Sequence, residues 1–137
     1  MTAPAVVLAA AWVCVRDRRV LVVRAQGSDA FYLPGGKPEP GESDAEAAAR
    51  EALEEVGLPV DPAALRLFTT IDAPAHNRPP GTRVRLVCFL SDRPEAGDPA
   101  PANEIVELAW FTSADSGRCA PAIRLLVDEL VDADLID

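Results

Sequence analysis

The apolar and polar residues of the chain form blocks that predict strands followed by a helix, and this order occurs twice. A continuous apolar run from Val6 to Val15 predicts a strand buried on both faces. Polar residues 16–19 predict a turn, and Val20–Val23 predicts a second strand that forms a hairpin with the first. Further strands are predicted over residues 65–71, 82–90 and 104–111. This order favours one mixed α/β (α+β) domain that spans residues 1–137.

Two helices complete this pattern. Ser43 is a candidate N-cap, and Glu46, three residues later, would complete a capping box. Gly57 supplies the residue that commonly ends a helix, so the first helix is expected to run to about Val56. The second helix is predicted from Pro121 to about Val131 because apolar residues recur there at helical spacing.

Composition and charge exclude several classes of protein and of binding partner. The 137 residues are 49% hydrophobic and 26% charged, which excludes a disordered or fibrous chain. The net charge of −9 and the lack of a clustered basic patch argue against polymeric nucleic acid and membrane surfaces as partners, and leave small anionic ligands open. Cys14, Cys88 and Cys119 form no CxxC pair, so buried thiols in a reducing compartment are expected. The apolar run near the N-terminus follows no positive segment, so a cytoplasmic location is expected.

Candidate chemistry is concentrated on the first helix. Glu51, Glu54 and Glu55 are spaced i, i+3 and i+4, so their carboxylates are close neighbours on one face. Arg50 lies four residues before Glu54 but cannot neutralise three carboxylates, whereas Mg²⁺ prefers such oxygen ligands. A solvated acidic face is the alternative. The Gly35-Gly36 pair before the helix favours the metal site, because it would let the backbone approach a ligand and present the Gly36 carbonyl.

The joint spacing of these residues is more specific than its parts. Five residues separate Gly36 from Glu42, and seven more lead to the run Arg50-Glu51-Ala52-Leu53-Glu54-Glu55-Val56-Gly57-Leu58. This resembles the Nudix box, GX5EX7REUXEEXGU with U an aliphatic residue, at every fixed position. The resemblance implies the α/β/α sandwich of the Nudix hydrolases, with a mixed central sheet.

The resemblance also implies roles for individual residues. Enzymes of the family use Mg²⁺ or Mn²⁺ to hydrolyse a nucleoside diphosphate linked to another group X. By likeness to them, Glu51, Glu54, Glu55 and the Gly36 carbonyl resemble the metal ligands, and Glu51 also resembles the proposed general base. Arg50 resembles the arginine that braces the glutamates, and Glu42 an outer supporting carboxylate. Outside the box, Glu104 and Glu107 are both candidates for a further ligand, with Glu104 favoured at the edge of its strand.

The sequence indicates the identity of the substrate less clearly than it indicates the metal ligands. Phe31 and Tyr32, directly before the glycines, are placed to stack on a base. Gly35, Lys37 and Arg24 are candidate contacts for the substrate, with Arg78, Arg83, Arg85 and His76 as weaker candidates. The short chain resembles MutT-like enzymes that convert a (d)NTP to a monophosphate and pyrophosphate. ADP-ribose or another nucleotide sugar as substrate, and a silent nucleotide-binding module, are the alternatives. The oligomeric state is open, with a homodimer among the options.

Overall fold

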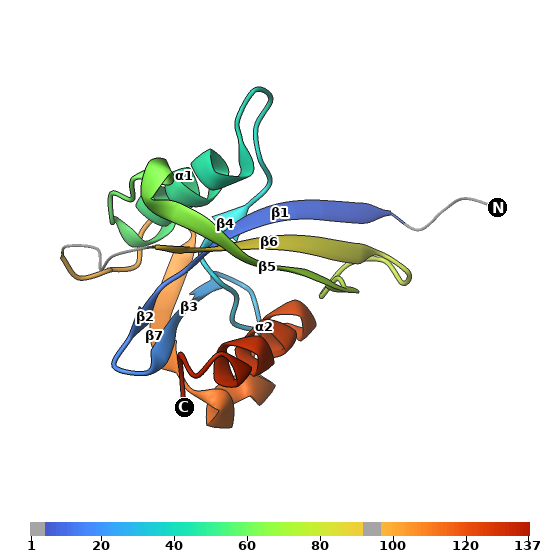
Figure 1. Ribbon diagram of the computed structural model, residues 1–137. Coiled ribbons are helices and arrows are strands. Elements are labelled where there is room, and N and C mark those ends of the chain that lie inside the picture. Colours follow the sequence, from blue (N-terminus) through green and yellow to red (C-terminus); the bar gives the residue numbers. More distant parts are fainter. Residues whose placement is uncertain (1–4, 92–96) are drawn as a thin grey trace.

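The computed structural model describes residues 5–91 and 97–137. In this part of the chain, strands form two sheets between two α-helices, α1 above and α2 below in Figure 1. The helices are α1 (Asp44–Val56) and α2 (Pro121–Asp132), with short 3-10 turns η1 (Pro62–Ala64) and η2 (Ser113–Arg118). The strands are β1 (Val6–Val13), β2 (Val15–Arg16), β3 (Arg19–Ala25), β4 (Gly35–Gly36), β5 (Leu65–Pro74), β6 (Arg83–Ser91) and β7 (Ile105–Phe111).

The sheet topology confirms the mixed α+β class and adds a second sheet to it. The four-stranded sheet has the order β4-β1-β6-β5, in which β1 and β6 are parallel and the other pairs are antiparallel. The three-stranded sheet, β2-β3-β7, is antiparallel. The helices pack on separate clusters of the core, with α1 on one and α2 on the other. This is the α/β/α arrangement that the resemblance implied.

The run Val6–Val15 differs from the single buried strand that was predicted. The chain leaves the first sheet after Val13 and joins the second at Val15, which pairs with Val20 in the expected hairpin. Only Ala10–Val13 is buried within β1, whereas Val6 and Leu8 are 57% and 41% exposed. On the other side of β1 from β6, β4 pairs with β1 only at Ala10 and Ala11.

The first helix forms as its sequence predicts. The Ser43 side chain accepts a hydrogen bond from the Glu46 backbone N–H at 3.1 Å, and the Glu46 carboxylate accepts one from the Ser43 N–H at 3.0 Å. This capping box stabilises the start of α1. Gly57 ends the helix in a left-handed conformation at φ 73°, which a glycine adopts without steric cost. Buried alanines on one face let α1 lie close to the sheet: Ala47, Ala48, Ala49 and Ala52.

The burial of the cysteines agrees with the expectation of buried thiols. Cys14, Cys88 and Cys119 are buried and free, as the lack of a paired spacing predicted. Burial raises the pKa of the Cys88 thiol to about 12, so this thiol stays protonated. Within the described residues, no helix is long and apolar enough to cross a membrane.

Candidate active site

Strand β4 brings its backbone directly against the carboxylates of α1. The Gly35 N–H donates a hydrogen bond to Glu55 Oε2 at 3.0 Å. A Cβ atom at Gly35 would lie 2.5 Å from the Ala10 carbonyl oxygen, and one at Gly36 would lie 2.6 Å from Glu51 Oε1. The first clash is with backbone and cannot be relieved by a side-chain rotation. Two successive glycines therefore allow this segment to pack between β1 and the acidic face of α1.

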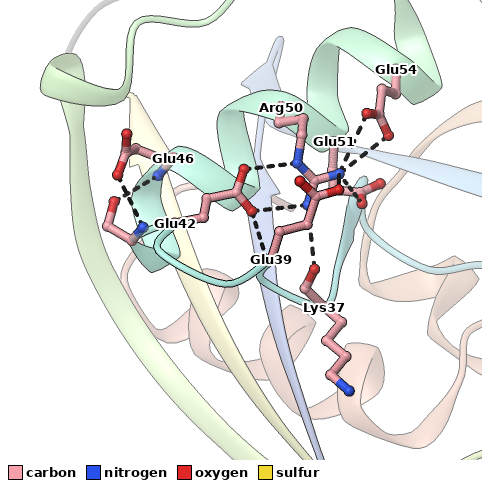
Figure 2. Close-up of polar contacts among 8 residues, drawn as sticks. Lys37, Glu39, Glu42, Glu46, Arg50, Glu51 and Glu54 are labelled. Carbon is pink, nitrogen blue, oxygen red and sulfur yellow. Dashed lines mark hydrogen bonds and ion pairs between the residues drawn. The ribbon is translucent and has the colours of Figure 1, made fainter.

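Arg50 gathers the carboxylates at the outer side of this face (Figure 2). Its Nε and Nη2 donate hydrogen bonds to the two oxygens of Glu42 at 2.8 and 3.0 Å. Its Nη1 donates to Glu51 Oε1 at 2.9 Å and lies 3.3 Å from Glu54 Oε2. The hydrogen bonds from Arg50 lower the pKa of Glu42, and those to Glu42 and Glu51 raise the pKa of Arg50. Arg50 and Glu42 thus form a bidentate brace beside the acidic turn of α1, the turn that carries Glu51, Glu54 and Glu55.

Glu55 lies apart from this brace, in the interior of the protein. Its side chain is buried, with 4% of the residue exposed, although Glu54 next to it is exposed. Burial, followed by the neighbouring Glu51, raises the pKa of Glu55 to about 9, while the hydrogen bond from the Gly35 N–H opposes this shift. A carboxyl group of this kind binds a proton at neutral pH unless another cation takes the place of the proton.

The donor set of the acidic turn fits a hard divalent cation. Glu51, Glu54, Glu55 and the carbonyl of Gly36 supply only oxygen atoms, which Mg²⁺ and Mn²⁺ prefer. The present side-chain positions gather these atoms without converging them on one point. In the described part of the chain, no group of three or more His, Cys, Asp or Glu side chains is arranged to hold a metal. Glu51 and Glu54 turn toward Arg50, and Glu55 toward Gly35. Rotations of these side chains would have to accompany metal binding.

A cavity of about 630 Å³ opens beside the glycines. Its walls are mainly apolar and include Ala9, Ala11, Leu33, Val84, Leu86 and Ile123. Glu55 and Glu104 contribute carboxylates to this lining, and Lys37 and Arg78 contribute cations. The cavity thus combines an apolar volume suited to an organic group with charged groups suited to phosphates and a metal.

The residues proposed to contact the substrate separate into two groups. Tyr32, Gly35 and Lys37 line the cavity. Phe31 is 4% exposed, and its ring packs against Phe111 with centroids 4.8 Å apart, so it is a core residue and not a base-stacking one. Arg24 donates to Glu107 at 2.8 Å and to the Ser28 carbonyl, and these bonds direct it away from a phosphate role.

The ion pair between Arg24 and Glu107 distinguishes the two carboxylates outside the Nudix box that were candidate metal ligands, Glu104 and Glu107. Glu107 is the partner of Arg24, whereas Glu104 lines the cavity and its charge raises the pKa of Glu55. The position of Glu104 supports the preference for it, and its role as a metal ligand stays a prediction.

The segment that carries Glu104 is fixed to the end of α1 by contacts that the sequence did not reveal. The N–H groups of Ala100 and Ala102 donate to the carbonyls of Val56 and Glu55, each at 3.0 Å. Asn103 Nδ2 donates to the Glu54 carbonyl at 2.6 Å. Asn103 adopts φ 52°, a conformation that asparagine tolerates better than most residues. The last carbonyls of the helix therefore place Glu104 close to Glu55.

Comparisons with known proteins identify relatives of the whole domain. A family model described as the NUDIX domain matches residues 6–128. A crystal structure of a MutT NUDIX hydrolase from Burkholderia pseudomallei superimposes with a TM-score of 0.74 at 24% identity, covering 91% of this chain and 98% of that one.

Two curated proteins of Bacillus subtilis (strain 168) are similar over shorter stretches. "Putative ADP-ribose pyrophosphatase YjhB" is 32% identical over 81 residues, 56% of this chain and 38% of that protein. "Putative 8-oxo-dGTP diphosphatase" is 48% identical over 41 residues, 30% of this chain and 28% of that protein. The matched part of the chain thus spans well under half the length of each of these relatives.

Proposed function

The chain belongs to the NUDIX domain family, and we propose that it is a metal-dependent hydrolase of nucleoside diphosphates linked to a further group. The favoured reaction is conversion of a nucleoside triphosphate to a monophosphate and pyrophosphate. Every fixed position of the family's acidic motif is present between Gly36 and Leu58, which argues against a silent binding module.

The observation that carries this proposal is the buried carboxyl group of Glu55 between the Gly35 backbone and the acidic turn. A buried acid beside Glu51 and Glu104 costs free energy when it ionises, and a divalent cation offsets that cost. Solubility alone does not account for a carboxylate that is only 4% exposed. The adjoining cavity supplies room for the nucleotide.

The chain's own residues then divide the chemical work. Glu51, Glu54, Glu55 and the Gly36 carbonyl would hold the metal, with Glu104 as a further ligand. When bound, Mg²⁺ or Mn²⁺ would neutralise the diphosphate and lower the pKa of a coordinated water. Glu51 is the candidate base that accepts a proton from the attacking water. Arg50 holds Glu51 through the 2.9 Å hydrogen bond, and Lys37 at the cavity is a candidate contact for phosphate oxygens.

ADP-ribose is the second candidate substrate. It is favoured by the name of the B. subtilis relative with 32% identity. The triphosphates are favoured by the MutT name of the B. pseudomallei structure.

The experiment measures phosphate, pyrophosphate and monophosphate release from nucleoside triphosphates, oxidised dGTP, ADP-ribose and nucleotide sugars in the presence of Mg²⁺. Wild type is compared with Glu54→Gln and with Glu46→Gln, a control in which the changed residue belongs to the capping box. We expect one substrate class to be turned over by wild type and by Glu46→Gln, and the rate to fall at least about 100-fold in Glu54→Gln. Equal rates in all three proteins would contradict the proposal, as would no turnover of any compound.

A further inference from the structure

Two loops that are distant in the sequence are joined beside the cavity. Asp29 lies in the segment between β3 and β4, and His76 and Asn77 lie in the turn between β5 and β6. His76 Nε2 is 2.8 Å from Asp29 Oδ1, and Asn77 Nδ2 donates to the same oxygen at 3.2 Å. The contact with Asp29 orients the His76 ring, and the bond from Asn77 holds the Asp29 carboxylate.

Aromatic rings and a cation meet at this junction. Tyr32, His76 and Arg78 all line the cavity, and the rings of Tyr32 and His76 have centroids 6.4 Å apart at an interplanar angle of 54°. Burial raises the pKa of Tyr32, Asp29 adds to the shift and Arg78 opposes it, so both charges act near the phenol. The phenol therefore remains neutral, and its ring presents an apolar face for stacking.

Arg78 differs from the other arginines near this part of the fold. Arg83 and Arg85 form ion pairs with Asp72, whereas no ion-pair partner of Arg78 is found among the described residues. A guanidinium group carries only donors, and its planar fork matches two adjacent acceptors. Arg78 is exposed to solvent where it lines the cavity, so its donors are accessible to a ligand that presents acceptors.

We propose that Arg78, with Tyr32 and the Asp29-held ring of His76, forms a subsite that selects a nucleobase with two adjacent acceptors, as in guanine, over adenine. Guanine presents the acceptors O6 and N7 as an adjacent pair, whereas adenine presents a donor at the position of O6. The guanidinium group of Arg78 carries only donors, so it can bond to both acceptors of guanine. With adenine, one of its N–H groups would face the amino group of the base. The inference deepens the proposed function, because it assumes that the ligand is a nucleotide.

The experiment uses GMP and AMP as probes and measures their binding to the full chain by calorimetry without metal. We expect GMP to bind about tenfold more tightly than AMP, the discrimination that one good bidentate pair supplies. Arg78→Gln should bring the two affinities close together, since an amide offers both a donor and an acceptor. Arg83→Gln is the matched control, because Arg83 is paired with Asp72 and is not part of the cavity lining, and it should keep the preference for GMP.

A second arm tests the orientation of His76. Asp29→Asn keeps the size of the side chain but removes the charge that holds the ring. In turnover of GTP we expect a severalfold higher KM with kcat unchanged, a split that a general loss of folding would not produce.

Several results would overturn the proposal. Equal affinity for GMP and AMP in wild type would do so, and so would a preference that survives in Arg78→Gln, or no binding of either nucleotide. An equal loss of both affinities in Arg78→Gln would assign Arg78 to phosphate instead of the base. A base preference in a protein that hydrolyses no nucleotide would contradict the proposed function and leave the subsite standing.

Discussion

Replacing the buried acid Glu55 with glutamine should stabilise the metal-free protein above about pH 5. Glutamine has nearly the same size and can still accept the hydrogen bond from the Gly35 N–H. The folded protein holds the proton of Glu55 up to about pH 9, whereas the unfolded chain releases it near the ordinary value of 4.5. Between these values the unfolded state binds fewer protons, so the stability of the wild type falls as the pH rises.

The size of this effect follows from the two pKa values of about 9 and 4.5. At pH 7.5 the group lies about 3 pH units above its unfolded value, which sets an upper bound of about 4 kcal/mol on the cost of keeping it in the folded state. Glu51 can rotate away and water can reach the carboxylate, so we expect Glu55→Gln to be more stable by about 1–3 kcal/mol at pH 7.5. The difference should shrink toward pH 5, where the proton remains on Glu55 in both states to a growing extent.

Urea unfolding in the presence of EDTA at pH 5, 7.5 and 8.5 measures this difference. Glu46→Gln is the control, since hydrogen bonds from Ser43 lower the pKa of Glu46 and keep it ionised over this range. Its difference from wild type should not change with pH. The reasoning is refuted if Glu55→Gln is less stable than wild type at pH 7.5, or if its advantage does not grow between pH 5 and pH 8.5.

Two further substitutions test the backbone around the acidic turn. Gly35→Ala should destabilise the protein by about 2–4 kcal/mol because its Cβ would lie 2.5 Å from the Ala10 carbonyl oxygen, and urea unfolding would show a lower midpoint. Gly117→Ala, where a Cβ would meet nothing within 4 Å, should stay within about 0.5 kcal/mol, and an equal loss in both would contradict this account. Ser43→Ala should cost about 1 kcal/mol through loss of the bond to the Glu46 N–H, and an unchanged thermal midpoint would argue against the capping box.

The sequence predicted the elements well where local chemistry determines them. The bounds of α1 follow from Ser43, Glu46 and Gly57, whose capping and left-handed conformations are local properties. The division of the strands between two sheets could not be predicted. The run Val6–Val15 is uniformly apolar, and no residue in it indicates that the chain passes from one sheet to the other at Cys14. Pairing between strands far apart in sequence determines that change.

The candidate site was predicted in its composition but not in its geometry. The spacing of Glu51, Glu54 and Glu55 placed them on one face, yet it could not show that Glu55 alone turns into the interior. Phe31 and Tyr32 are adjacent in the sequence, and only tertiary packing buries Phe31 against Phe111 while Tyr32 lines the cavity. A side chain's partner across the fold cannot be inferred from its neighbours along the chain.

Binding of Mn²⁺, followed by electron paramagnetic resonance, tests most directly whether the acidic turn of α1 is a metal site. Wild type and Glu46→Gln should bind Mn²⁺ with the same affinity, and added Mg²⁺ should displace it from both. Glu55→Gln should bind at least about tenfold more weakly, because one oxygen ligand loses its charge. Equal Mn²⁺ affinity in all three proteins, or no binding by the wild type, would contradict the account.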